Sequence, residues 1–180
     1  MGFSKKLLCS AVLLAFSTVA AAQQQARVSG DVVRIGVLTD MNGFLSDMTG
    51  TGAVTAVKMA VEDFGGKVLG KPIEVLLADN QNKADLASSI ARSWFDNQQV
   101  DMIIDLGNSA TGLSAAIVAA EKNRIAIATS PGTTRLTNEN CSATTVHYAY
   151  DTYALAAGTV STLVKLGLDA WYFMTIDFAG

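Results

Sequence analysis

The stretch DMIIDLGNSATGLSAA, residues 101–116, joins a strand pattern directly to a helix pattern. Residues 102–106 are mostly apolar, as in a buried strand, and Leu113 and Ala116 begin a repeat at helical spacing. Three small polar residues, Asn108, Ser109 and Thr111, stand at the junction. A strand followed at once by a helix is the building unit of α/β proteins, so this stretch predicts the fold class.

The same alternation continues on both sides of this stretch. Helix patterns separate strand patterns along the chain, with strands predicted at residues 32–38, 73–78, 102–106 and 125–128, and helices at 53–64, 86–95 and 113–120. Nearly continuous apolar strands are typical of a parallel sheet that is buried on both faces. We therefore predict an α/β fold, a parallel sheet with helices on both faces and right-handed crossovers.

The last part of the chain is less regular. Residues 130–145 are rich in Thr, Asn, Ser and Gly and are predicted to form a loop. A further helix is predicted at 153–164, and the apolar residues 171–174 predict a fifth strand that reaches Asp177.

The N-terminus has the pattern of an export signal. Lys5 and Lys6 precede an apolar run over residues 7–19, and small residues follow at 20–22. The run is shorter than the ~20 apolar residues that a membrane-spanning helix needs. Residues 1–22 are therefore predicted to be a cleavable signal peptide, with no membrane insertion after cleavage.

The net charge and the cysteine content limit which partners the chain can have. The formal net charge is −3, and removal of Lys5 and Lys6 with the signal peptide leaves −5. No basic stripe interleaved with aromatic residues is present, so nucleic acid is excluded as a partner. Cys9 lies in the signal peptide, which leaves Cys141 either as a buried thiol or as half of a bridge whose partner is outside this chain.

Catalytic and metal sites find little support. The segment GNSAT resembles the nucleophile turn of hydrolases, but Thr111 stands where that turn needs glycine. His147 is the only histidine, and no His or Cys pair has metal-ligand spacing. The Gly-rich segment at 50–55 places Thr55 where a dinucleotide loop needs Gly or Ala. We predict no enzyme activity, no metal and no cofactor.

Polar residues do gather where two neighbouring strands end. Ser109 and Thr111 follow the strand at 102–106, and TSPGTT, residues 129–134, follows the strand at 125–128. In open parallel sheets ligands bind beyond these carboxyl ends, where helix N-termini present free N–H groups. The hydroxyls can cap the helix or bind a ligand, and both alternatives are open. The pattern predicts a cleft wall suited to a carboxylate or another small polar group.

A family resemblance rests on several segments taken together: VRIGVLTDMNG, AVKMAVEDFGGKVLGKPIEVLLADNQNKADLA, GNSAT, SPGTT, YDTYALAAGT and WYFMTIDFAG. From about residue 32 to 180 the chain resembles the leucine-binding-protein-like, type I class of periplasmic substrate-binding proteins of ABC transporters. The resemblance implies a type I periplasmic-binding-protein fold, in which a solute is trapped between two hinged lobes. Residues 31–147 would then form the first lobe, and residues 148–180 the crossover and the start of a truncated second lobe.

The resemblance also implies which residues contact the ligand. The loops after the third and fourth strands would hold a carboxylate, and an aromatic residue of the second lobe, Phe178, would cover it, although FAG departs from the family pattern there. Phe44, beyond the first strand, either forms part of the cleft floor or packs against the first helix. The expected loop contacts are Ser109, Ala110 (through its backbone), Thr111, Gly132, Thr133 and Thr134.

The function implied is that of a non-catalytic periplasmic receptor of an ABC importer. It would capture a small carboxylate- or amide-bearing solute, such as an amino acid or an aromatic acid, and deliver it to a membrane permease. The alternative is a secreted sensing module of the same fold that acts on a chemoreceptor or a kinase.

Overall fold

The apolar strand β1 (Val33–Thr39) lies near the middle of a six-stranded sheet with the order β2-β3-β1-β4-β5-β6. The computed structural model describes residues 28–174. Five strands run parallel, and the two-residue β2 pairs antiparallel with β3. The other strands are β2 (Lys67–Val68), β3 (Lys71–Asp79), β4 (Met102–Asp105), β5 (Ile125–Ala128) and β6 (Thr145–His147).

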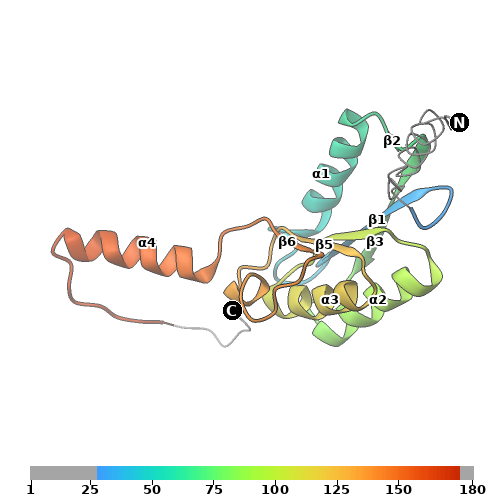
Figure 1. The fold of residues 1–180 in the computed structure, drawn as a ribbon. Coiled ribbons are helices and arrows are strands. Elements are labelled where there is room, and N and C mark those ends of the chain that lie inside the picture. The colour runs from blue at the N-terminus through green and yellow to red at the C-terminus, as the bar shows by residue number, and fades with distance from the viewer. Residues whose placement is uncertain (1–27, 175–180) are drawn as a thin grey trace, which may run out of the picture.

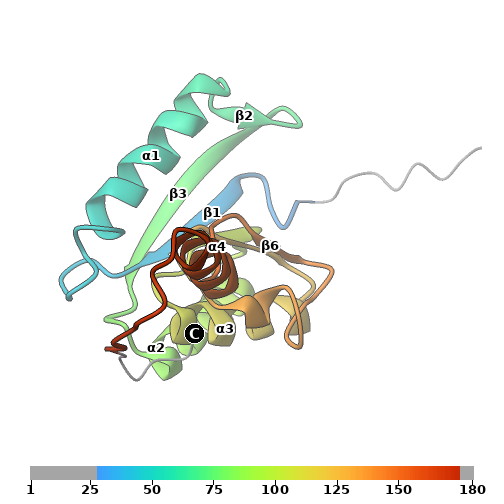
Figure 2. The same ribbon diagram turned by 90° about the vertical axis from the view of Figure 1, so that its left-hand side faces the viewer.

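Helices cover both faces of this sheet, as predicted (Figures 1 and 2). Helix α1 (Gly50–Asp63) lies on one face, and α2 (Ala84–Asn97) and α3 (Ser109–Glu121) pack side by side on the other. The main core lies between this helix pair and the strands. Its buried members include Leu38, Ala91, Trp94, Phe95, Ile103, Leu113 and Val118. The α/β fold class is confirmed.

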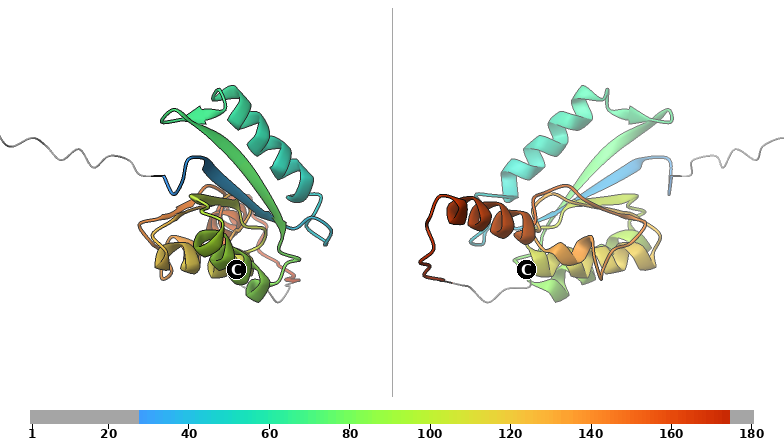
Figure 3. Two further views of the ribbon diagram at one scale, coloured as in Figure 1. Left: turned by 90° about the vertical axis from the view of Figure 1, so that its right-hand side faces the viewer. Right: turned by 60° about the vertical axis from the view of Figure 1, so that its left-hand side comes forward.

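The C-terminal part differs from the prediction in several places. The expected loop at 130–145 contains a short 3-10 helix, η1 (Thr134–Leu136), and reaches the first residue of β6. Helix α4 (Thr152–Lys165) buries no residue and projects away from the sheet (Figure 3). Residues 171–174 form no strand and are exposed. A strand is stable only when its backbone groups are paired, and none of the described strands pairs with this segment.

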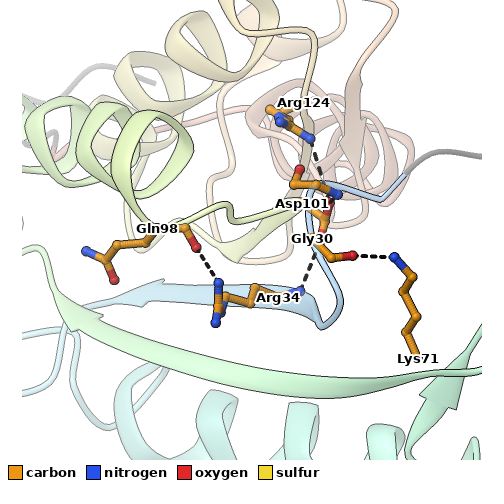
Figure 4. A network of polar contacts seen from close by, with 7 residues as sticks. Gly30, Arg34, Lys71, Gln98, Asp101 and Arg124 are labelled. Atoms are coloured by element: carbon orange, nitrogen blue, oxygen red, sulfur yellow. Dashed lines mark hydrogen bonds and ion pairs between the residues drawn. The ribbon is translucent and has the colours of Figure 1, made fainter.

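A network of polar contacts lies at the amino ends of the central strands β1 and β4 (Figure 4). The Asp101 carboxylate accepts hydrogen bonds from the Ser29 N–H at 2.7 Å and the Arg34 N–H at 3.0 Å. Arg124 approaches the same carboxylate at 3.7 Å, and the Arg34 guanidinium donates to the Gln98 carbonyl at 3.0 Å. The network fixes the segment that leads into β1.

Other expectations concern exposure and the chain ends. Cys141 is exposed, so the buried-thiol alternative is wrong. Within residues 28–174, no helix combines the length and the apolar character needed to cross a membrane. The predicted signal peptide and Phe178 lie outside the described residues.

Candidate functional site

Loops at the carboxyl ends of the parallel strands enclose a cavity of about 640 Å³. The loops that follow β1, β3, β4, β5 and β6 all contribute to its wall. The lining residues are Phe44, Leu45, Met48, Thr49, Asn82, Gly107, Asn108, Ser109, Ala110, Thr129, Ser130, Ala149 and Tyr150. The cavity therefore lies where open parallel sheets bind ligands.

The turn between β4 and α3 forms one wall. Three successive residues, Asp105, Leu106 and Gly107, have positive φ angles of 80°, 72° and 65°. The Leu106 N–H donates to the Leu38 carbonyl at 2.9 Å, which ties this turn to the end of β1. The chain thereby reverses within a few residues and brings the first turn of α3 to the cavity.

A reciprocal capping box fixes the start of α3. The Asn108 side chain accepts from the Thr111 N–H at 3.0 Å, and the Thr111 hydroxyl accepts from the Asn108 N–H at 2.9 Å. The Thr111 hydroxyl also donates to the Leu106 carbonyl at 2.5 Å, and Thr111 is fully buried. Of the two alternatives for Thr111, the structure shows helix capping.

Ser109 and Ala110 line the cavity directly. The Ser109 hydroxyl makes no hydrogen bond to any of the described residues, although 4% of the residue's surface remains exposed. It belongs to the first turn of α3, where backbone N–H groups have no partner within the helix. An uncharged hydroxyl beside a helix N-terminus can bind an anionic group.

Of the segment that follows β5, residues 129 and 130 line the cavity and residues 132–134 do not. The hydroxyls of Thr129 and Ser130 line the cavity and donate to buried Asp105 at 3.0 and 2.5 Å. Thr133 is fully buried, and its hydroxyl accepts from the Arg135 N–H at 3.3 Å. The predicted contact segment at 132–134 is therefore not part of the cavity lining.

The rest of this segment supports the wall from behind. The Gly132 carbonyl accepts from the Thr152 N–H at 2.8 Å, and Thr134 begins η1. His147, the only histidine, forms a 2.6 Å hydrogen bond with the Pro131 carbonyl, which gives it a structural contact here.

The loop between β1 and α1 supplies an apolar rim. Buried Asp40 accepts from the N–H groups of Gly43 at 2.7 Å and Leu45 at 3.1 Å, and so shapes the loop. Phe44 and Met48 line the cavity and are 83% and 73% exposed. Phe44 therefore lies at the cavity and is not packed into the core.

No charged side chain lines the cavity within residues 28–174. Nearby Asp79 ends β3. Burial opposes its ionisation, but the N–H groups of Gln81 and Met41 and the Asn42 amide donate hydrogen bonds to the carboxylate and lower its pKa below the ordinary value. Across the part of the chain that the structure describes, no three His, Cys, Asp or Glu side chains are grouped as a metal site would require.

Several lining residues were missed by the sequence analysis. Asn82 and Thr49 follow β3 and β1, and only the strand order β3-β1-β4 brings these loops to the end of β4. Tyr150 follows β6, a strand that the sequence analysis did not predict. The polar run DNQNKAD after the strand at 73–78 was the available signal for Asn82.

The cavity is uncharged and lies at the carboxyl ends of a parallel sheet, which is where open α/β folds bind ligands. The sequence model of the periplasmic binding protein family matches residues 32–180, and the chain belongs to this family. No match was found among curated proteins. The fold is the type I periplasmic-binding-protein fold, as the resemblance implied.

Solved structures of the same kind come from several bacteria. A periplasmic binding protein from Burkholderia mallei is 55% identical, with a TM-score of 0.72 over 76% of this chain and 36% of that chain. A branched-chain amino acid ABC transporter ligand-binding protein from Burkholderia xenovorans LB400 is 37% identical, with a TM-score of 0.71 over 75% and 36% of the two chains.

A third relative was solved with a ligand. The solute-binding protein of an ABC transporter from Rhodopseudomonas palustris BisB5, in complex with 3,4-dihydroxybenzoic acid, is 26% identical, with a TM-score of 0.68 over 77% of this chain and 37% of that chain. This chain thus spans little more than a third of the length of these relatives. All three relatives are described as binding proteins.

Proposed function

We propose that the chain provides the first-lobe wall of a periplasmic solute receptor of an ABC importer. The receptor captures a small carboxylate- or amide-bearing solute, such as an amino acid or an aromatic acid, between two lobes and delivers it to a membrane permease. The observation that carries this proposal is the cavity beside the first turn of α3, with Ser109 in its wall and no hydrogen bond from the described residues to its hydroxyl.

Three residues are proposed as ligand contacts from this lobe. Ser109 and the Ala110 backbone bind the polar group of the solute at the N-terminus of α3, and Phe44 contacts its apolar body. Thr111 and Thr133 hold the wall in place through their capping bonds. The other ligand contacts expected from the sequence stay predictions: Thr111, Gly132, Thr133, Thr134 and Phe178.

The remaining assignments follow from the same proposal. Residues 1–22 direct export to the periplasm and are removed. Residues 31–147 form the first lobe, and residues 148–180 cross to the second lobe. Helix α4 buries no residue, which agrees with a segment that packs against a different lobe.

The test is ligand binding by the full-length protein that carries this chain. Thermal shift identifies binders among benzoate, 3,4-dihydroxybenzoate, leucine and leucinamide, and calorimetry gives their affinities. Ser109→Ala should weaken binding of an acid about ten- to a hundredfold, because a hydrogen bond to a charged group contributes about 1.5–3 kcal/mol.

Ser88→Ala is the matched control, since Ser88 lies outside the cavity lining and its hydroxyl donates to the Asp85 carbonyl within α2. Equal affinities of Ser109→Ala and Ser88→Ala for the acid would show that the Ser109 hydroxyl does not bind the ligand. Failure of every acid, amino acid and amide to bind would contradict the receptor proposal. Stimulation of a reconstituted permease and its ATPase by the loaded protein would support transport, whereas response only from a chemoreceptor or kinase would support the sensing alternative.

A further inference from the structure

The Asn82 side chain joins two separate walls of the cavity. It lies between β3 and α2 and lines the cavity. Its Nδ2 donates to the Asp40 carboxylate, and its Oδ1 accepts from the Asn108 Nδ2 at 3.0 Å. Its own N–H donates to Asn80 Oδ1 at 2.9 Å, and its φ is +55°.

Each partner of Asn82 shapes a loop that forms the cavity. Asp40 organises the loop of Phe44 through hydrogen bonds from two backbone N–H groups. Asn108 caps α3 and so places Ser109. Among residues 28–174, no hydrogen bond joins the loop at 40–49 directly to the turn at 106–111, and Asn82 is the bridge between them.

We propose that Asn82 is a positioning residue of the ligand site, because its amide sets the separation between the Phe44 loop and the first turn of α3. The inference rests on the proposed function for its effect on binding, while the bridge itself can be tested without a ligand. Sequence reasoning did not identify this residue, since its two partners lie 42 and 26 positions away in the chain.

The bridge needs the chemistry of an amide. Asp40 is a carboxylate and requires a donor, whereas the Asn108 Nδ2 requires an acceptor. The carboxylate introduced by Asn82→Asp still accepts from Asn108, but it forms a hydrogen bond with Asp40 only when one of the two carboxyls carries a proton and donates it. Two adjacent carboxylates repel each other until they share a proton.

The neighbouring charges are Asp79 and Lys83. The Asp79 carboxylate is occupied by Met41, Asn42 and Gln81, and Lys83 Nζ bonds to the Gln81 side chain at 3.1 Å. Neither bonds to Asn82. An acid-dependent rescue of Asn82→Asp would therefore report on the pair formed with Asp40.

The experiment uses the full-length protein with Asn82→Ala, Asn82→Asp and the control Asn97→Ala, because Asn97 is exposed at the end of α2. Hydrogen exchange is measured on peptides that cover 41–49 and 107–113, relative to the natural protein at the same pH. We expect both segments to exchange faster in Asn82→Ala while the buried part of α2 stays protected. In Asn82→Asp the increase should be present near pH 7 and reversed at about pH 5.

Calorimetry with 3,4-dihydroxybenzoate completes the test. Asn82→Ala should bind it about tenfold more weakly than the Asn97→Ala control. Unchanged exchange in either segment, or an Asn82→Asp variant that is insensitive to pH, would overturn the inference. If the natural protein does not bind this acid, the ligand proposal fails for this acid, and the exchange result still decides whether Asn82 forms the bridge.

Discussion

Gly112→Ala tests how closely α3 packs against the segment that follows β5. Gly112 is buried in α3, and a Cβ at this position would lie 2.5 Å from Pro131 Cγ and 3.0 Å from Pro131 Cβ. Carbon atoms in contact are normally about 3.5–4.0 Å apart. Pro131 is itself fully buried and its ring is rigid, so α3 or the segment at 129–133 must shift.

Two opposing effects determine the size of the change. Replacing glycine by alanine inside a helix stabilises it by about 1 kcal/mol. Overpacking a well-packed site costs about 1–3 kcal/mol. We therefore expect Gly112→Ala to lower the free energy of unfolding by up to about 2 kcal/mol. Gly52→Ala in α1 is the matched control, because a Cβ there meets nothing within 4 Å.

The assay is urea unfolding of both variants in the full-length protein, compared at equal m-values. Gly52→Ala should raise the midpoint and Gly112→Ala should lower it, with free energies of unfolding that differ by about 1–3 kcal/mol. An equal rise in both midpoints would show that Pro131 does not restrict Gly112, and the packing described for this wall would be wrong.

Three further outcomes are expected. Thr111→Val should lower the free energy of unfolding by about 1–2 kcal/mol because it breaks the capping box. Ser109→Ala should change the free energy of unfolding by less than about 0.5 kcal/mol. Equal effects of the two variants in urea unfolding would contradict the different roles of the two hydroxyls. Asp79 has a lowered pKa, so its stabilisation is present above its ordinary value of 3.8 and is lost as the pH falls through the folded-state pKa. Between about pH 6 and pH 3, the free energy of unfolding should fall less steeply in Asp79→Asn than in the natural protein. Identical pH profiles of the two proteins would refute this. Asp101→Ala removes the acceptor of two backbone N–H groups and should cost about 1–3 kcal/mol by the same assay, whereas a loss below about 0.5 kcal/mol would show that the network adds little.

The regular part of the fold could be predicted because its strands and helices carry their own patterns. The stretch at 101–116 predicts β4 and α3 within a few residues of their observed bounds. The two-residue β2 is too short to show any periodicity, and β6 has only three residues. Residues 171–174 have the composition of a strand, but pairing depends on a neighbour that composition does not reveal.

The site was harder to predict because it is assembled from segments that are distant in the chain. Ser109 and Ala110 line the cavity, and the sequence pointed to them because a strand end followed by a helix start is visible in it. The sequence left open whether Thr111 caps the helix or binds a ligand, because one hydroxyl can serve either purpose. The role of Asn82 depends on the strand order, which places β1 between β3 and β4.

The uncharged lining of the cavity also has a consequence for how salt would affect ligand binding. Salt weakens attraction between exposed charges, with a screening length of about 10 Å at 0.1 M. Hydroxyl, amide and backbone donors bind through short contacts, which dissolved ions hardly screen. Under the proposed function, this lobe's contribution to the ligand affinity should therefore change little from dilute to saline surroundings, and a strong salt dependence of ligand binding would originate outside this lobe.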